Sequence, residues 1–428
     1  MEQVRLPHLL PVPDWMPAWL VGPGLGNFSL ADFIGLFILL NFILGFVMFE
    51  IWLERKVGGH IQLRRGPLHV GPHGALQSPA DVLKLLTKED LTPETADKRI
   101  FKMAPYLIFI PVFLTYIVIP WGGLWPFNLT VRPFDLSLIY IVAIPSVQGL
   151  GMVVAGWSSG NKYSLLGAAR VVAQFISYEL PMVVTLLSVG ILAESLSVAQ
   201  AVETQRASTW FMFLQPIGFF IFIITMMSEM HRTPFDIAIA ESEIVGGPFI
   251  EYSGMRWGLF FLAEFAAVFL NASLAVALFM GGPELFPFAE RLPIPGISGI
   301  PGIAADATLL RQIGDSLGVF IFMGKAMTIM VLVQWARFAL PRIRIDQLMD
   351  LAWKVILPAA FANLILTAVY QQFGFPAFGI GLTLALVTVG IIALNYRIRF
   401  TPASTGIRLV SVGPAGATAH ATTVPGSA

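Results

Sequence analysis

The sequence contains no cysteine among its 428 residues. The chain therefore offers no thiolate for an iron–sulfur cluster and no disulfide, and we expect any redox centre that it serves to lie on another polypeptide. Charged residues are scarce, at 12%, and Lys plus Arg balance Asp plus Glu, with 26 of each. A formal net charge of zero argues against nucleic acid as a partner.

Apolar residues dominate the chain. They make up 56% of it and the mean hydropathy is +0.76, values typical of a protein that crosses a membrane many times. A spanning helix needs about 20 mostly apolar residues to cross a hydrocarbon layer of roughly 30 Å. The sequence predicts an all-α polytopic membrane protein with about nine transmembrane helices, at residues 31–52, 103–124, 136–156, 166–192, 209–228, 256–281, 314–335, 353–373 and 378–396.

The distribution of basic residues predicts the orientation of these spans. Cytoplasmic loops collect Lys and Arg, and most of the 26 lie in connections that follow odd-numbered spans. The opposite side would hold Arg5, Arg132, Arg206, Arg291 and Arg311. We therefore expect the N-terminus outside and the C-terminus in the cytoplasm.

Composition also divides the chain into regions. We predict an N-terminal extension on the outer side at 1–30, a transmembrane domain at 31–400 and a disordered cytoplasmic tail of small residues at 401–428. Pro and Gly are frequent at 282–312, which indicates an outer loop with little regular structure.

Among the ionisable side chains inside predicted spans, three stand out. Glu179 is near the middle of the fourth span, Glu264 about two turns into the sixth, and Lys325 near the centre of the seventh. Burying charge in a membrane is costly, so such residues are rare and tend to be functional. They could form a chain of titratable groups along which protons move. The alternative is that Glu179 or Glu264 pairs with Lys325 or Arg170 only to hold helices together.

A cluster of carboxylates occurs between two long apolar runs, in the stretch SEMHRTPFDIAIAESEIVGG at 228–247. Its charged members are Glu229, Arg232, Asp236, Glu241 and Glu243. Like charges in a partly desolvated loop raise one another's pKa, so these groups could hold protons. The alternative is a solvated acidic turn, although the apolar flanking segments favour a packed loop.

The first predicted cytoplasmic loop, 54–90, changes character along its length. Its first half combines Arg55, Arg64 and Arg65 with several glycines. From 75 to 89, apolar residues recur at helical spacing, which predicts a short amphipathic helix lying in the membrane interface. That helix could serve only as an anchor. Phosphate binding is disfavoured, because no glycine-rich phosphate motif stands between a strand and a helix.

Four sequence blocks resemble one family. The blocks are ERKVGGHIQLRRGP, GWSSGNKYSLLGAARVVAQFISYE, SEMHRTPFDIAIAESEIVGGPFIEYSGM and RFALPRIRIDQLMDLAWKVILP, in this order between roughly residues 30 and 375. They are similar to signature blocks of the H subunit of NADH:quinone oxidoreductases, the membrane component of respiratory complex I at its junction with the peripheral arm. The chain ends and residues 282–312 fall outside the blocks.

The resemblance implies a role in quinone binding and proton translocation. In such proteins the basic first loop and its helix form the membrane-side entrance of a chamber for the substrate quinone, menaquinone or ubiquinone. Arg55, Arg64 and Arg65 would line or brace that chamber. The loop that couples quinone chemistry to the membrane would include Arg232, Asp236, Glu241 and Glu243. The acidic path toward antiporter-like pumping subunits would include Glu179, Glu229 and Glu264, with Lys325 as charge partner.

The resemblance also implies a setting and partners. We expect a multi-pass protein of a bacterial plasma membrane that binds peripheral quinone-site subunits and antiporter-like membrane subunits. No covalently bound or metal cofactor is expected on this chain.

One departure from the family pattern concerns the acidic loop. Relatives carry Glu two or three residues after Pro-Phe-Asp, where this chain has Ile239; either Glu241 covers that role, or water and neighbours do. Two other functions stay open: the corresponding subunit of an energy-converting hydrogenase or formate-oxidising complex, and a stand-alone secondary transporter with a mid-bilayer site.

Overall fold

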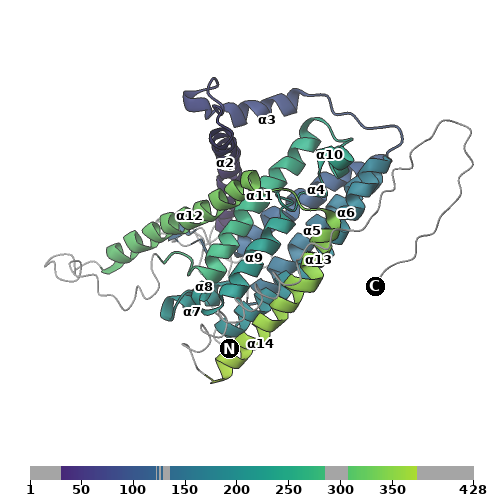
Figure 1. Ribbon diagram of the computed structural model, residues 1–428. Coiled ribbons are helices and arrows are strands. Elements are labelled where there is room, and N and C mark those ends of the chain that lie inside the picture. Colours follow the sequence, from purple (N-terminus) through teal and green to yellow (C-terminus); the bar gives the residue numbers. More distant parts are fainter. Residues whose placement is uncertain (1–29, 122, 125–126, 129–134, 285–306, 374–428) are drawn as a thin grey trace, which may run out of the picture. The chain divides into compact units, whose positions relative to one another are not determined.

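The computed structural model describes residues 30–121, 123–124, 127–128, 135–284 and 307–373 (Figure 1). All of them belong to one compact unit, Met1–Leu384, whereas a second unit, Ala385–Ala428, lies outside the described residues. The predicted N-terminal extension, the ninth span at 378–396, the tail at 401–428 and most of the loop at 282–312 also fall outside them. Those four expectations stay predictions.

The described residues contain seven helical stretches that are long and apolar enough to cross a membrane. They are α2 (Leu30–Ile61), α4 (Lys98–Thr115, continued by the 3₁₀ turn η3 at Tyr116–Val118), α5 (Ser137–Ser158), α6 (Lys162–Ala193), α11 (Gly254–Phe279), α12 (Ala307–Ala339), and a last stretch formed by α13 (Ile345–Leu351), the π-helical segment η6 (Ala352–Ile356) and α14 (Leu357–Phe373). Each overlaps a predicted span. The predominantly helical fold with several candidate membrane spans is therefore confirmed for the described residues, whereas the predicted total of nine spans is not. Helices suit a membrane because they satisfy their backbone polar groups internally where water is absent.

The fifth predicted span, 209–228, is broken in the structure. It consists of α8 (Phe211–Leu214) and α9 (Pro216–Glu229), and α9 has only 14 residues. Gln215 adopts φ −134° and ψ 69° at the break, because the residue before a proline is pushed out of the helical region. The buried Gln215 side chain accepts a hydrogen bond from Ser188 Oγ at 2.8 Å and another from Asn363 Nδ2 at 3.3 Å.

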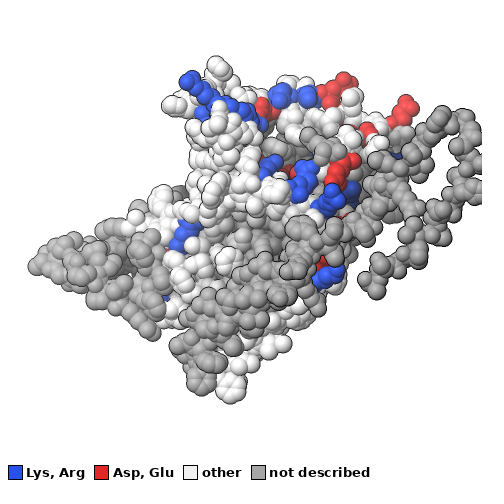
Figure 2. Space-filling view, viewed as in Figure 1, with Lys and Arg blue, Asp and Glu red and all other residues white. Residues whose placement is uncertain are grey.

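Shorter elements connect the long helices. They are η2 (Pro72–Gly74), α3 (Gln77–Thr87), the paired two-residue strands β1 (Gly123–Leu124) and β2 (Phe127–Asn128), α7 (Val198–Ala207), α10 (Glu241–Ile244) and η4 (Gly247–Phe249). A helix thus stands where the sequence predicts one at 75–89, and Leu83 and Leu86 on it are exposed. Figure 1 shows α3 crossing the end of α2. Most charged side chains visible in Figure 2 gather at this end.

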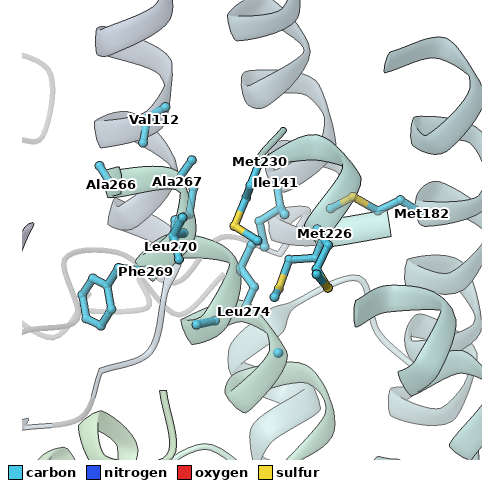
Figure 3. Packing of buried hydrophobic residues seen from close by; sticks show 14 of the residues in the cluster. Val112, Ile141, Met182, Met226, Met230, Ala266, Ala267, Phe269, Leu270 and Leu274 are labelled. Atoms are coloured by element: carbon cyan, nitrogen blue, oxygen red, sulfur yellow. The ribbon is translucent and has the colours of Figure 1, made fainter. Parts of the chain in front are cut away.

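Helix α11 lies at the centre of the packing, and most of its side chains are buried. Figure 3 shows Ala266, Ala267 and Leu270 of α11 beside apolar residues of neighbouring helices, among them Val112 of α4 and Met226 of α9. Small residues allow membrane helices to approach closely, and dispersion contacts then stabilise the bundle. This packing surrounds α11 with α2, α4, α9 and α12, the helices that carry much of the site described below.

A glycine contact between α5 and α6 tests this packing. A Cβ placed on Gly156 would lie 2.5 Å from Ala168 Cβ and 2.7 Å from the Ser164 carbonyl oxygen, whereas a Cβ on Gly45 of α2 would meet nothing within 4 Å. We expect Gly156→Leu to destabilise the protein by about 1–3 kcal/mol through overpacking, and Gly45→Leu to leave it unchanged. Both variants are heated in detergent to a series of temperatures, and the fraction of protein that stays monodisperse is measured. Equal heat resistance of the two would contradict this packing.

Candidate functional site

Four charged side chains from distant parts of the chain converge near one end of the bundle. Arg232 Nη1 lies 3.0 Å from Glu54 Oε2, and Arg232 Nε lies 3.4 Å from Glu264 Oε1. Arg337 forms a second ion pair with Glu54. The cluster therefore joins α2, the segment after α9, α11 and α12, and Arg232 at its centre is 3% exposed.

Local turns hold Arg232 in place. Its backbone N–H donates to the Met227 carbonyl at 3.2 Å, and its own carbonyl accepts from the N–H of Phe235 at 2.8 Å. Burial opposes the charge of the guanidinium, but the carboxylates of Glu54 and Glu264 outweigh it and raise the pKa of Arg232 above its usual range. The guanidinium also lies 4.5 Å from the centre of the Phe265 ring. Arg232 is thus a permanent buried cation.

A cavity of about 740 Å³ opens beside this cluster. Glu54, Glu264 and Arg337 lie on its charged side, and aromatic side chains such as Phe249 and Phe260 supply an apolar wall. Its size and mixed lining match cavities that bind small organic molecules with a polar head and an apolar body.

The basic residues of the first loop border an adjoining hollow of about 550 Å³, which Arg55, Arg64 and Arg65 line. Arg55 lines both spaces and pairs with Asp81 of α3 at 2.6 Å. Partial burial raises the pKa of Asp81, but the hydrogen bond and charge of Arg55 outweigh it and hold that pKa below its usual range. The structure therefore places all three predicted arginines around this hollow and next to the cavity.

The acidic residues of the 228–247 stretch do not share one site. Asp236 lines the cavity and pairs with Arg342 at 3.1 Å, whereas Glu243 forms an ion pair with Arg170. Glu241 begins α10, and its side chain lies outside the described part. Ile239 lines the cavity and contributes apolar surface there.

Glu229 and Glu179 line a narrow pocket of about 20 Å³ between α5, α6 and α9. Ser146 Oγ donates a hydrogen bond to the Glu179 carboxylate, and Glu229 hydrogen-bonds with Asn271. The Gln174 side chain ties the pocket to the loop through the carbonyls of Ser228 and Phe235, at 2.8 and 2.9 Å. A space of this volume accommodates about one water molecule.

His231 lines this narrow pocket as well as the large cavity. The side chain is buried, and burial lowers the pKa of His231 to about 4. The imidazole is therefore neutral at physiological pH.

Lys325 lies away from these acids. Its Nζ donates to the carbonyl oxygens of Met280 at 2.6 Å, Gly282 at 3.1 Å and Glu284, and it lies 4.3 Å from the centre of the Trp210 ring. These carbonyls follow the C-terminal end of α11, where a cation is favourable. The structure thus does not make Lys325 the charge partner of Glu179 or Glu264.

The partners found instead differ from those the sequence suggested. Glu264 pairs with Arg232, Glu179 accepts from Ser146, and Arg170 pairs with Glu243. The spans alone could not predict these pairs, because hydropathy places a residue at a depth in the membrane but does not say which helices are neighbours.

Sequence reasoning also missed Glu50, Glu54, His231 and Arg337. Glu50 is fully buried, and neither carboxylate oxygen has a hydrogen-bond partner among the described residues. It lies inside the first predicted span and four residues before Glu54, so both point to one helix face. The criterion that singled out Glu179 would have found Glu50. Within the same described residues, no group of three His, Asp or Glu side chains is placed to hold a metal ion.

Comparison with known proteins identifies the family of the chain. A profile of the family described as NADH dehydrogenase matches residues 34–368. The chain is 40% identical over 347 residues to the H subunit of NADH-quinone oxidoreductase from Dehalococcoides mccartyi, covering 80% of this chain and 88% of that protein. It is 42% identical over 345 residues to the proteins of the same name from Bacillus thuringiensis and Bacillus cereus, covering 80% of this chain and 95% of theirs. The chain therefore belongs to the NADH dehydrogenase family, together with these relatives.

Proposed function

We propose that this protein is the membrane subunit of a proton-pumping NADH:quinone oxidoreductase in which the cavity of about 740 Å³ forms part of the quinone chamber. The observation that carries the proposal is the position of this cavity beside a buried arginine held by two carboxylates. Family membership supplies the reaction, and the cavity supplies a place for the substrate on this chain.

The lining of the cavity suits a quinone. An isoprenoid tail favours aromatic walls such as Phe249 and Phe260, whereas the head group gains two electrons and two protons and passes through negatively charged states. The electrons come from partner subunits. Arg55, Arg64 and Arg65 supply positive potential on the side of the adjoining hollow, and fixed cations near developing negative charge stabilise it.

The same cluster offers a means of coupling. Two unit charges 4 Å apart interact by about 4 kcal/mol at an effective dielectric constant of about 20. A negative charge arriving in the cavity would compete with Glu54 and Glu264 for Arg232, and the released carboxylate would then bind a proton more readily. Quinone reduction is thereby converted into a change of protonation inside the protein.

We propose an acidic path that leads from this cluster through Glu264, Glu229 and Glu179. Asp236 belongs to the cavity side of the path and Glu243, paired with Arg170, to the loop beside it. Glu241 is proposed from its place in the sequence. The contacts of Lys325 with the carbonyls beyond α11 favour a structural role for that residue.

The partners and location follow from this function. Peripheral quinone-site subunits would complete the chamber at the end where α3 lies, and antiporter-like membrane subunits would receive the path. We propose a bacterial plasma membrane, with the basic first loop in the cytoplasm, as the positive charge of cytoplasmic loops favours. Menaquinone or ubiquinone would be the substrate.

Isolation of the complex through a tag on this chain tests the proposal. We expect peripheral subunits to copurify, NADH to reduce a short-chain quinone, and a photoreactive quinone to label peptides of α2 and α11 unless excess unlabelled quinone is present. Electron input from hydrogen or formate alone would instead support the hydrogenase or formate-oxidising alternative. Transport by the isolated chain in proteoliposomes would support a secondary transporter.

Charge reversal in the first loop tests the basic side of the chamber. We expect Arg64→Glu or Arg65→Glu to raise the apparent quinone KM about tenfold, which corresponds to about 1.4 kcal/mol of lost binding. The control is Arg99→Glu, because Arg99 is exposed near the start of α4 and lines neither space. An unchanged KM in both loop variants would assign them to anchoring alone.

Neutralisation of Glu179 tests the acidic path. We expect Glu179→Gln to lower pumping-coupled quinone reduction about tenfold or more, because an amide cannot exchange the proton that the path requires. Glu194→Gln is a matched control, since Glu194 caps the C-terminal end of the same helix and is exposed. Membrane vesicles would report NADH oxidation and acidification together, and full pumping with Gln at 179 would remove Glu179 from the path.

A further inference from the structure

His231 is the one residue of the described chain that lines both the large cavity and the narrow Glu179–Glu229 pocket. The two spaces are otherwise bordered by different side chains. Among the described residues, His231 therefore forms the wall that the two spaces share, and a proton passing from one to the other would meet it there.

The backbone explains how one residue reaches both sides. His231 adopts φ 51°, in the left-handed region that a non-glycine residue rarely occupies. Its N–H donates to the Ser228 carbonyl at 3.1 Å. This turn separates Glu229, whose side chain lines the pocket, from Arg232, which pairs with Glu264 of the cavity wall. The conformation is costly, so the surrounding turn must hold it.

The chemistry of the ring fits transfer of a proton. One ring nitrogen donates to the Glu229 carbonyl oxygen, which in a neutral imidazole leaves the other nitrogen as an acceptor. An imidazole can take up a proton on one nitrogen and release another from the second. The pocket has room for about one water molecule, which could carry the proton between Glu229 and the ring.

We propose that His231 is the proton link between the cavity and the Glu179–Glu229 pocket. This inference rests on the proposed function, because it takes the cavity as the place of quinone reduction. A proton leaves a carboxyl group of the pocket, binds one imidazole nitrogen, and the other nitrogen releases a proton to the reduced quinone oxygen. The electrons arrive from the partner redox subunits, so the imidazole changes only its protonation.

A structural role for His231 makes a different prediction from a relay role. If the residue serves only the turn, then glycine, which adopts positive φ freely, should replace it without loss. Asparagine also tolerates this conformation and keeps a polar side chain, but it does not titrate. A relay role predicts loss in both variants, and it predicts that only the glycine variant has room for an added imidazole.

The experiment uses the assembled complex in membrane vesicles, with NADH oxidation, quinone reduction and proton uptake measured together. We expect His231→Gly and His231→Asn to lower the rate of coupled quinone reduction at least tenfold, with quinone KM within about twofold of the unaltered protein. Added imidazole should restore the glycine variant several-fold and leave the asparagine variant unchanged. The control is His69→Asn, because His69 is exposed in the first loop.

Each outcome has a distinct meaning. Unaltered rates and proton-to-electron ratios in either variant would overturn the relay, and so would a loss in the glycine variant that imidazole does not restore. If only one variant assembles, its rate still decides between relay and turn. Vesicles of the unaltered complex that fail to reduce quinone with NADH would overturn the proposed function instead, which keeps the two failures apart.

Discussion

The ion pairs of the buried Arg232 guanidinium hold the site together. They join Glu54 of α2 to Glu264 of α11, and Arg337 of α12 reaches the same Glu54. Removing one partner from a buried pair costs about 3–5 kcal/mol, because a charge is left uncompensated. The ion pairs of Arg232 therefore hold together the helices around the cavity. The same ion pairs would respond to a charge on the quinone in the proposed coupling.

The position of this cluster depends on where the short helix α9 ends. The helix ends at Glu229, and the following turns bring His231 and Arg232 back into the protein. At the other end, the break at Gln215 is stabilised by Ser188 and Asn363, which satisfy part of a buried amide where the helix stops. A longer, unbroken α9 would carry the chain past this point as helix, without the polar turns that pack between α6, α11 and α12.

Two further residues lie around this cluster, one apolar and one acidic. Ile239 gives the cavity an apolar surface, and Glu50 adds a buried carboxyl one helical turn from Glu54. Acidic groups near Arg232 are therefore contributed by α2 as well as by α11. Glu50 lies within electrostatic range of Arg232 and Glu264, so a charge on any member of the cluster affects the others.

The amino-acid sequence was sufficient to predict most membrane-spanning helices and the family, because lipid excludes unpaired backbone groups and because four motif blocks retain their order. It also singled out the arginines of the first loop, Glu264 and Asp236, which the fold places around the cavity and the adjoining hollow. The ion pairs follow only from the packed fold: Arg232 and Glu54 are 178 positions apart, and no local pattern records such a contact. The packed fold also places Lys325 against the carbonyls that follow α11, and His231 between two spaces. Hydropathy predicts the depth of a helix in the membrane, whereas side-chain packing determines which helices are its neighbours.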